Sequence, residues 1–278
     1  MSLFTDRQLT ALKRNGFVVL SDVVDDDTIE AARDAFWDGF PTDRDDYEGL
    51  TTEPERFENA WEYIEDPDPF REINDQLFPY AEALAGEGTL ERPDGRIQVT
   101  PRFPTGEQTE GDERPPLHRA TGHIDGYGPH FDEHYEVGYY TVMAAVYLDR
   151  VDPRGGGFTV WPGSHWYAGD YYADHHLESL VNDATLPAYE DGEWTRGEAL
   201  AHQTDPLEIH GDAGTVVFWH QNLLHCGGIN TSPYTRLSAI QRFVRPDAEE
   251  IKRDAYANPW KYWEGMDGVE LPSAPSER

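Results

Sequence analysis

At 278 residues, with 38% hydrophobic and 13% aromatic side chains, the chain has a globular composition and enough length for one large β domain or two small domains. Its 54 acidic and 22 basic residues give a formal net charge of −32, which repels nucleic acid and anionic membranes. No apolar stretch could span a bilayer and the single Cys226 excludes internal disulfides, so we expect a cytoplasmic protein without nucleic-acid or membrane partners.

Residues 1–94 show mainly helical patterns. Thr5 and Gln8 have capping-box spacing and Gly16 is a natural stop, so a first helix is expected from Thr5 to Asn15. Pro69 suits a first helical turn and favours a helix over Phe70–Ala85. The other elements expected here are a strand at Phe17–Leu20, a helix opening at Asp27 with Ile29, Ala32, Phe36 and Phe40 on one face, a polar loop over Pro41–Pro54, and a helix at Phe57–Ile64.

After Gly95 the pattern changes to short strand-like segments separated by Pro, Gly and Asp turns. The expected strands are Arg96–Phe103, Tyr139–Leu148, Phe158–Trp161, Ala199–Ile209, Thr215–Trp219 and Tyr234–Val244. A helical insertion is expected over Asp174–Val181. Irregular strands with turn signals indicate a jelly roll or barrel. We therefore expect a single domain over residues 1–278, with a helical part at 1–94, a β core at 95–245 and a packed tail at 246–278.

Histidine–acid pairs are the first candidates for a metal site, because residues two apart on a strand point to the same face. Such pairs include His123–Asp125, His130–Asp132, His176–Glu178 and His210–Asp212. His176 and Glu178 lie in a helical pattern, which points the two side chains in different directions. The sequence GDAG after His210 predicts a turn. The pairs at His123 and His130 remain alternatives. Together with His225, either pair could supply two imidazoles and one carboxylate, the facial set of non-haem iron oxygenases.

Four sequence blocks resemble those of one enzyme family: GFVVLSDVV, HIDGYGPH, GGGFTVWPGSH and LLHCGGINTSPYTRLS. They span roughly Phe17 to Val244 and resemble the phytanoyl-CoA dioxygenase family of iron(II)- and 2-oxoglutarate-dependent oxygenases, which includes ectoine hydroxylase. The number of residues between His123 and the strand with PGSH fits the family. If His130 were the first ligand, this spacing would be too short. The resemblance implies a mainly β fold with flanking helices, a double-stranded β-helix (jelly roll, cupin-like) with a helical N-terminal third.

The resemblance also implies roles for individual residues. His123, Asp125 and His225 are expected to bind Fe(II). Arg236, eleven positions after His225, is expected to form a salt bridge to the distal carboxylate of the co-substrate 2-oxoglutarate, since a guanidinium fork matches a carboxylate. Ser238 lies two positions further on the same strand face and is expected to share that carboxylate. A further residue, Gln98 in RIQVTPRF, matches a family position that approaches the co-substrate, and His165 falls where the family role is structural.

The implied reaction hydroxylates an unactivated C–H bond of a small-molecule substrate, consumes O₂ and releases succinate and CO₂. Family halogenases carry a small residue at the position of Asp125, so its carboxylate indicates hydroxylation rather than halogenation. The chain has few cations to hold CoA phosphates, which argues against phytanoyl-CoA as the substrate. His130, His134 and nearby acids favour a small polar or cationic molecule. The oligomeric state stays open.

Two other functions could use the same residues: a non-catalytic cupin-like binding protein, or a metal hydrolase. An intact ligand set with Arg236 argues against the first, and Arg236 has no evident role in the second. Each residue also has an ordinary structural interpretation. His225 could be a core histidine, Arg236 could form a surface ion pair of little energetic value, and Ser238 and Gln98 could be satisfied polar groups on strands.

The acidic composition has two interpretations. It could recruit cations or a basic partner, or it could be the solvated, salt-adapted surface of a protein from an extreme halophile, which we prefer. Repulsion between the acidic groups is screened in molar salt, where the Debye length is about 3 Å. We therefore expect the protein to lose stability when it is desalted. The measurement is the unfolding midpoint in low and in molar KCl, and equal midpoints would contradict salt adaptation.

Overall fold

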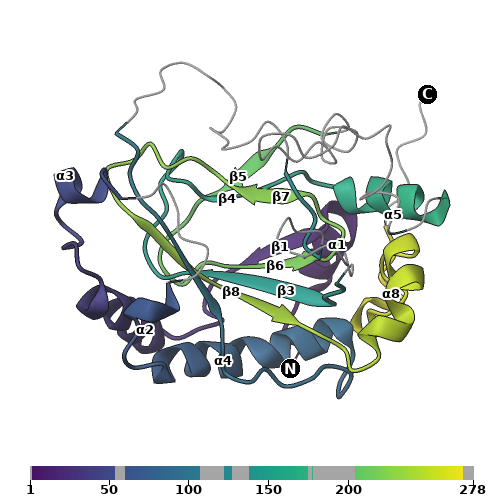
Figure 1. Ribbon diagram of the computed structural model, residues 1–278. Coiled ribbons are helices and arrows are strands. Elements are labelled where there is room, and N and C mark those ends of the chain that lie inside the picture. The colour runs from purple at the N-terminus through teal and green to yellow at the C-terminus, as the bar shows by residue number, and fades with distance from the viewer. Residues whose placement is uncertain are drawn as a thin grey trace.

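The computed structural model describes residues 2–53, 60–106, 122–126, 138–174, 177 and 204–271 (Figure 1). Within them, the strands form two antiparallel sheets, one in the order β1-β6-β3-β8-β2 and one in the order β5-β4-β7. The strands are β1 (Phe17–Leu20), β2 (Gln98–Arg102), β3 (Val142–Tyr147), β4 (Phe158–Val160), β5 (Leu207–Ile209), β6 (Val216–His220), β7 (His225–Gly227) and β8 (Arg236–Phe243). The helices are α1 (Asp6–Asn15), α2 (Asp26–Gly39), α3 (Tyr47–Leu50), α4 (Asp68–Ala85), α5 (Ser164–Asp174) and α8 (Ala248–Ala257), with 3₁₀ turns η1 (Trp61–Tyr63) and η2 (Glu264–Met266).

The central strand β3 separates two hydrophobic cores, because successive residues of a strand point to opposite faces. Ala144 and Val146 pack in a cluster with residues of α4, which runs along the outer face of the five-stranded sheet (Figure 1). Met143 and Tyr147 point the other way and pack with Phe158 of the three-stranded sheet. One alternate set of side chains from each sheet therefore faces the interior between the sheets.

The N-terminal helix and the first strand follow the sequence pattern. Thr5 and Gln8 form the expected capping box, and α1 ends at Gly16, whose φ of +84° lies in the left-handed region. A Cβ at Gly16 would lie 2.6 Å from Nδ1 of His165, so a larger residue does not fit. β1 pairs with β6 at the edge of the larger sheet. The predictions of α1, β1 and α4, which carries Pro69 in its first turn, are confirmed.

Three predictions in the helical part need correction. α2 begins one residue before the predicted Asp27, because the carboxylate of Asp25 caps it by accepting a hydrogen bond from the backbone of Thr28 at 2.8 Å. The segment predicted as a polar loop contains α3, which Asp46 caps at 3.0 Å through the backbone N–H of its third residue. The helix predicted over Phe57–Ile64 contains the short turn η1 instead, and residues 57–59 lie outside the described residues.

The six strands predicted after Gly95 are present as β2 to β6 and β8, with shifted ends, although residues 199–203 of one lie outside the described residues. β7 was not predicted as a strand. The PGSH block, expected on a strand, forms a turn and begins α5, because Gly163 has a φ of +82° and Oγ of Ser164 accepts a hydrogen bond from the backbone of Leu224 at 2.9 Å. α5 ends at Asp174, where a helix was expected to begin, and residues 175, 176 and 178–181 of that prediction lie outside the described residues.

The residues after β8 pack against the rest of the chain through α8 and η2. The rings of Trp260 and Trp263 lie 4.7 and 5.2 Å from the ring of His220 on β6, measured between centroids. Trp260, Trp263 and Met266 are buried, whereas Leu271 is exposed. None of the described helices combines the length and the apolar character needed to cross a membrane.

Candidate metal centre

Three side chains predicted as metal ligands converge in the structure. The ligand atoms of His123, Asp125 and His225 all lie within 4.8 Å of one another, and they form the only such group among the described residues. Oδ1 of Asp125 lies 3.4 Å from Nε2 of His123 and 3.8 Å from Nε2 of His225. Two ligands at about 2.1 Å from a shared metal lie roughly 3–4 Å apart. The three atoms could therefore hold a metal ion with little rearrangement.

Backbone pairing holds the two histidines side by side. His123 and His225 exchange two backbone hydrogen bonds, at 2.8 and 2.9 Å, in an isolated antiparallel bridge. This close approach requires Gly122, where a Cβ would lie 2.8 Å from the carbonyl oxygen of His225. Gly126 has a φ of +91°, and a Cβ there would lie 2.3 Å from the carbonyl oxygen of Gly138. Two glycines thus allow residues 122–126 to dock on β7.

The backbone of Asp125 is held by a buried network that includes the C-terminal helix. The side-chain amide of Gln221 donates hydrogen bonds to the carbonyl oxygen of Asp125 and to the hydroxyl of Tyr256, the latter at 2.6 Å. Oε1 of Gln221 accepts a hydrogen bond from the backbone of Tyr140 at 2.9 Å. Tyr256 in turn donates to the carbonyl oxygen of Gly138 at 2.8 Å. Because Tyr256 belongs to α8, the tail supports the metal centre as well as the core.

His225 is oriented with Nε2 toward the other two ligands. Its Nδ1 lies 2.8 Å from the carbonyl oxygen of Leu223, which can only accept, so Nδ1 carries the proton and Nε2 offers a lone pair. Burial lowers the pKa of His225 to about 4, so the ring is neutral at pH 7, as a metal ligand must be. The rings of Phe158 and Trp219 pack against it at 5.1 and 5.4 Å. These contacts keep the ring in one orientation and shield it from water.

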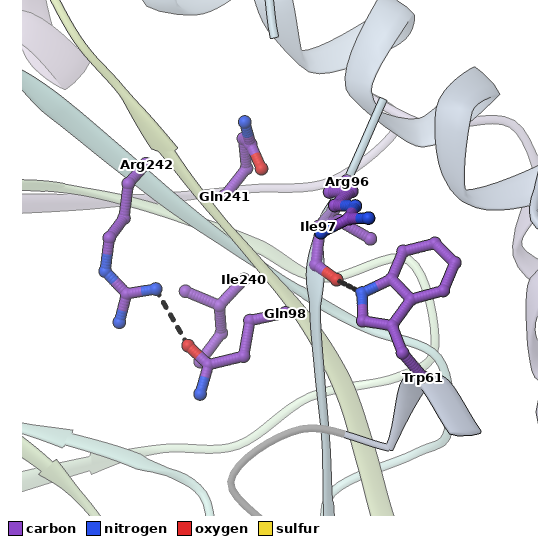
Figure 2. Close-up of a pocket in the computed structure, with 7 residues that line it drawn as sticks. All are labelled: Trp61, Arg96, Ile97, Gln98, Ile240, Gln241 and Arg242. Carbon is purple, nitrogen blue, oxygen red and sulfur yellow. Dashed lines mark hydrogen bonds between the residues drawn. The ribbon is translucent and has the colours of Figure 1, made fainter. Parts of the chain in front are cut away.

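The two oxygens of Asp125 face different partners. Oδ1 faces the histidines, whereas Oδ2 accepts a hydrogen bond from Nε of Arg242 at 2.9 Å. Nη1 of Arg242 also donates to Oε1 of Gln98 at 2.7 Å (Figure 2). Burial acts to raise the pKa of Asp125, but Arg242 and the two histidines outweigh it and hold the pKa well below its ordinary value. The carboxylate is therefore ionised, with one oxygen fixed and the other available to a metal.

Arg236, at the start of β8, is a buried cation with only neutral hydrogen-bond acceptors. Its Nε donates to the carbonyl oxygen of Gly156 at 2.9 Å, and its Nη1 donates to the carbonyl oxygen of Thr100 at 3.4 Å and to Oγ of Ser238. No carboxylate in the described part of the chain forms an ion pair with it. Burial lowers the pKa of Arg236 to about 10. A guanidinium in this setting is stabilised by any anion that reaches it.

A glycine-rich turn connects Arg236 to the metal centre. Gly156, which accepts from Arg236, has a φ of +76°, and a Cβ there would lie 3.0 Å from the Cβ of Asn230. The amide of Asn230 donates to the carbonyl oxygen of Arg102 at 2.9 Å and so ties the end of β2 to the start of β8. Two residues after Gly156, Phe158 packs on the ring of His225. The guanidinium and the three candidate ligands are therefore linked through β4 and its preceding turn.

The other histidine–acid pairs do not join this group within the described residues. His210 and Asp212 are exposed in the turn before β6, as expected from GDAG. The pairs at His130 and His176 lie outside the described residues, so their placement relative to the triad is not described. His165 is buried, with Nε2 3.1 Å from the carbonyl oxygen of Lys13. Cys226, between His225 and Gly227 on β7, packs on the opposite face from His225, in the cluster around Trp161.

Sequence reasoning missed three residues of this site: Arg242, Gln221 and Tyr256. Arg242 has a signal in the sequence, because it follows Arg236 by six positions on a predicted strand, and an even spacing places both on one face. Gln221 and Tyr256 have none, since they act through backbone contacts with Asp125, far from them in sequence.

Comparison with known proteins agrees with the resemblance in the motifs. Residues 12–238 match the profile of the phytanoyl-CoA dioxygenase (PhyH) family. The chain belongs to the phytanoyl-CoA dioxygenase family. A search of curated proteins found no significant match to the sequence. The match includes all six residues predicted to act in the site.

Solved structures of 2-oxoglutarate enzymes resemble this phytanoyl-CoA dioxygenase family member. EctD from S. alaskensis, crystallised with 2-oxoglutarate and 5-hydroxyectoine, is 18% identical, with 88% of this chain and 77% of that chain covered and a TM-score of 0.51. The non-haem epimerase SnoN from nogalamycin biosynthesis is 18% identical, with 86% and 82% covered and a TM-score of 0.49. HygX from Streptomyces hygroscopicus, with nickel and 2-oxoglutarate bound, is 15% identical, with 87% and 88% covered and a TM-score of 0.46. At this identity, the likeness to EctD concerns the fold alone.

Proposed function

We propose that the chain is an Fe(II)- and 2-oxoglutarate-dependent oxygenase that hydroxylates an unactivated C–H bond of a small-molecule substrate. The observation that carries this proposal is the pairing of two features in one interior. His123, Asp125 and His225 present two neutral nitrogens and one carboxylate oxygen to a common point. Arg236 is a buried guanidinium without a carboxylate partner in the described part of the chain, and it is linked to His225 through the turn at Gly156.

The donor set fits iron(II) and the guanidinium fits 2-oxoglutarate. His123, Asp125 and His225 would hold the ion through three ligands and would leave its other positions to the 2-oxo acid end of the co-substrate and to O₂. Arg236 holds the distal carboxylate in this proposal, with Ser238 beside it, because a guanidinium binds a carboxylate through two parallel hydrogen bonds. When bound, iron and 2-oxoglutarate supply the oxidative chemistry, which consumes O₂ and yields succinate, CO₂ and the hydroxylated product.

The residues of the chain contribute position, charge and exclusion of water. Arg242 fixes one oxygen of Asp125, so that the other keeps a constant direction toward the metal. Phe158 and Trp219 cover the ring of His225 and keep water from that side. The carboxylate of Asp125 occupies the position that a halide requires in family halogenases. This supports hydroxylation rather than halogenation, and chlorinated product from the unaltered protein would contradict it.

Anaerobic reconstitution with Fe(II) and 2-oxoglutarate tests the proposal. We expect a charge-transfer absorbance band on mixing and release of succinate only after O₂ is admitted. His225→Ala should abolish both signals, and His210→Ala, which removes an exposed histidine from the turn before β6, is the matched control that should retain them. Stoichiometric metal binding without either signal would favour a non-catalytic metal-binding protein or a hydrolase instead.

We also propose a jelly-roll fold for the chain. Two antiparallel sheets whose alternate residues face a shared interior support a double-stranded β-helix in a single domain over residues 1–278. The single cysteine and the net charge of −32 support a reducing, salt-rich cytoplasm as its setting.

A further inference from the structure

A cavity of about 510 Å³ opens beside the first residues of β2 and the last residues of β8. Figure 2 shows the seven residues that line it: Trp61, Arg96, Ile97, Gln98, Ile240, Gln241 and Arg242. Three of these side chains are mainly apolar, two are amides and two are arginines. The cavity therefore offers an apolar wall for the body of a small molecule and a polar, cationic wall for one end of it.

The charge of this lining is opposite to that of the protein. Among the described residues no acidic side chain lines the cavity, although the chain has 54 acidic and 22 basic residues. Arg242 shares its charge with Asp125 behind the lining, whereas Arg96 has no ion pair in the described part of the chain, so the described lining is locally cationic in a strongly negative molecule. An oxyanion that enters this cavity is attracted at short range, whereas a cation is repelled by the arginines.

Arg242 connects the cavity to the candidate metal centre. Its Nε donates to Oδ2 of Asp125 at 2.9 Å and its Nη1 donates to Gln98 at 2.7 Å. Within the described residues Nη2 has no hydrogen-bond partner. A ligand bound to Nη2 therefore lies one side chain away from a candidate metal ligand. A metal ion at Asp125 would share the negative charge of that carboxylate and leave more of the Arg242 charge to a ligand.

Arg96 brings a second guanidinium to the opposite side of the cavity (Figure 2). Its backbone is held at both ends, because its N–H donates to Asp94 at 3.0 Å and its carbonyl oxygen accepts from Asn74 at 3.4 Å. The next residue, Ile97, accepts a hydrogen bond from the indole of Trp61. No ion pair of Arg96 occurs within the described residues, although its side chain is exposed in an acidic protein. Its charge is therefore available to a ligand.

We propose that this cavity binds the substrate, and that the substrate is a small molecule with an apolar body and an oxyanion group, such as a carboxylate, held by Arg96 and Arg242. The inference rests on the proposed oxygenase function and names its substrate class. Of the small polar or cationic molecule expected from His130 and His134, which lie outside the described residues, it keeps the polar molecule and replaces the cation with an anion. Guanidinium forks match oxyanions, and a neutral or cationic group leaves Arg96 without a charged partner and Nη2 of Arg242 without an acceptor within the described residues.

Fluorine NMR with four matched probes tests the inference on the full chain loaded with Zn(II), which binds the same ligands without turnover. The probes are 4-fluorophenylacetate, 4-fluorophenyl phosphate, the neutral 4-fluorophenylacetamide and the cationic 4-fluorobenzylamine. We expect at least one oxyanion to bind about tenfold more tightly than the amide, and the amine to bind least. The better of the two oxyanions identifies the group. Equal binding of oxyanion and amide, or preference for the amine, overturns the proposal.

Two variants locate the binding. Arg96→Gln should weaken oxyanion binding about tenfold and leave the amide unchanged. Arg92→Gln is the matched control, because it removes the same charge four residues earlier, from an exposed pair with Asp75 outside the cavity, and should have no effect. Equal losses in both variants would mean that the probe responds only to net charge, which contradicts a site at Arg96.

A competition with 2-oxoglutarate separates this inference from the proposed function. Saturating 2-oxoglutarate should leave probe binding intact, because the co-substrate is expected at Arg236. If it displaces the probe, the cavity serves the co-substrate and the inference is wrong. If 2-oxoglutarate does not bind the metal-loaded protein at all, the oxygenase proposal fails, while the preference among the four probes still decides whether an oxyanion site exists.

Discussion

Arg236 and Arg242 lie six residues apart on one face of β8, and both are largely withdrawn from water. Their partners differ. Arg242 faces the carboxylate of Asp125, and although burial acts to lower its pKa, this carboxylate raises the pKa above its ordinary value. Arg236 faces two carbonyl oxygens and a hydroxyl, and burial lowers its pKa to about 10. The same residue type on the same strand is therefore paired with a carboxylate at one end and hydrogen-bonded only to neutral acceptors at the other.

This difference separates an arginine that is paired with a carboxylate of the chain from one that has no such partner in the described residues. A buried cation paired within the chain stabilises the folded protein, because each charge compensates the burial of the other. A buried cation without such a partner costs folding energy, and an anionic ligand can recover that cost on binding. The contrast predicts that the two arginines respond in opposite ways to the same substitutions.

The largest effect is expected on 2-oxoglutarate binding. Arg236→Ala should weaken it roughly hundredfold, because two charge-assisted hydrogen bonds are lost, each worth about 1.5–3 kcal/mol before compensation. Arg236→Lys keeps the charge without the fork and should lose less. Affinity is measured anaerobically from the charge-transfer absorbance, and iron affinity from competition with a chelator. A loss of iron affinity as large as the loss of 2-oxoglutarate affinity would show that Arg236 supports the metal centre instead.

In the metal-free protein, replacement of Arg242 should lower the free energy of unfolding, whereas replacement of Arg236 should not. Arg242→Met leaves Asp125 buried without its cation and should lower the free energy of unfolding by about 2–3 kcal/mol. Arg236→Met removes a buried charge with no carboxylate partner in the described residues and should leave the stability unchanged or raise it. Urea denaturation at pH 7 measures both. A larger loss for Arg236→Met would mean that its three neutral acceptors satisfy the guanidinium after all.

The sequence predicted the strand that carries these arginines but only one of the two roles. Tyr234–Val244 alternates clearly enough to be read as a strand, and Arg236 falls in a recognisable block. Arg242 acts through Asp125, which lies 117 positions earlier, and no local pattern encodes that contact. The sequence did not predict β7, because the glycines after His225 are typical of a turn. Pairing with β4 makes His225–Gly227 a strand. Contacts between distant segments decide such elements, and local propensity does not.

Buried histidines differ from the buried arginines, because a histidine can become neutral on burial by losing its proton, whereas Arg236 keeps its charge. Burial lowers the pKa of His165 to about 3 and that of His220 well below its ordinary value of 6.5. Below about pH 6.5 the unfolded chain therefore binds more protons than the folded one, and stability falls with the pH until the folded values are reached. The expected slope is up to about 1.4 kcal/mol per pH unit for each histidine.

Denaturation of metal-free protein between pH 6.5 and 4 measures this slope. His165→Gln should flatten it by the contribution of one histidine, whatever its effect on stability at pH 7. His210→Gln, at an exposed position in the turn before β6, is the matched control for the loss of a histidine. A slope identical in His165→Gln and in the unaltered protein would mean that His165 does not bind a proton on unfolding in this range.

The smallest effect is expected at Ser238, whose hydroxyl accepts a hydrogen bond from Arg236. Ser238→Ala should weaken 2-oxoglutarate binding about threefold to tenfold, the range for one hydrogen bond of about 1 kcal/mol, and Ser238→Thr should retain most of the affinity. The double variant with Arg236→Ala distinguishes two roles. If Ser238 acts by holding the guanidinium, its effect disappears once Arg236 is absent. If its hydroxyl contacts the co-substrate directly, the two losses add, and the binding site for the distal carboxylate extends along β8 beyond a single arginine.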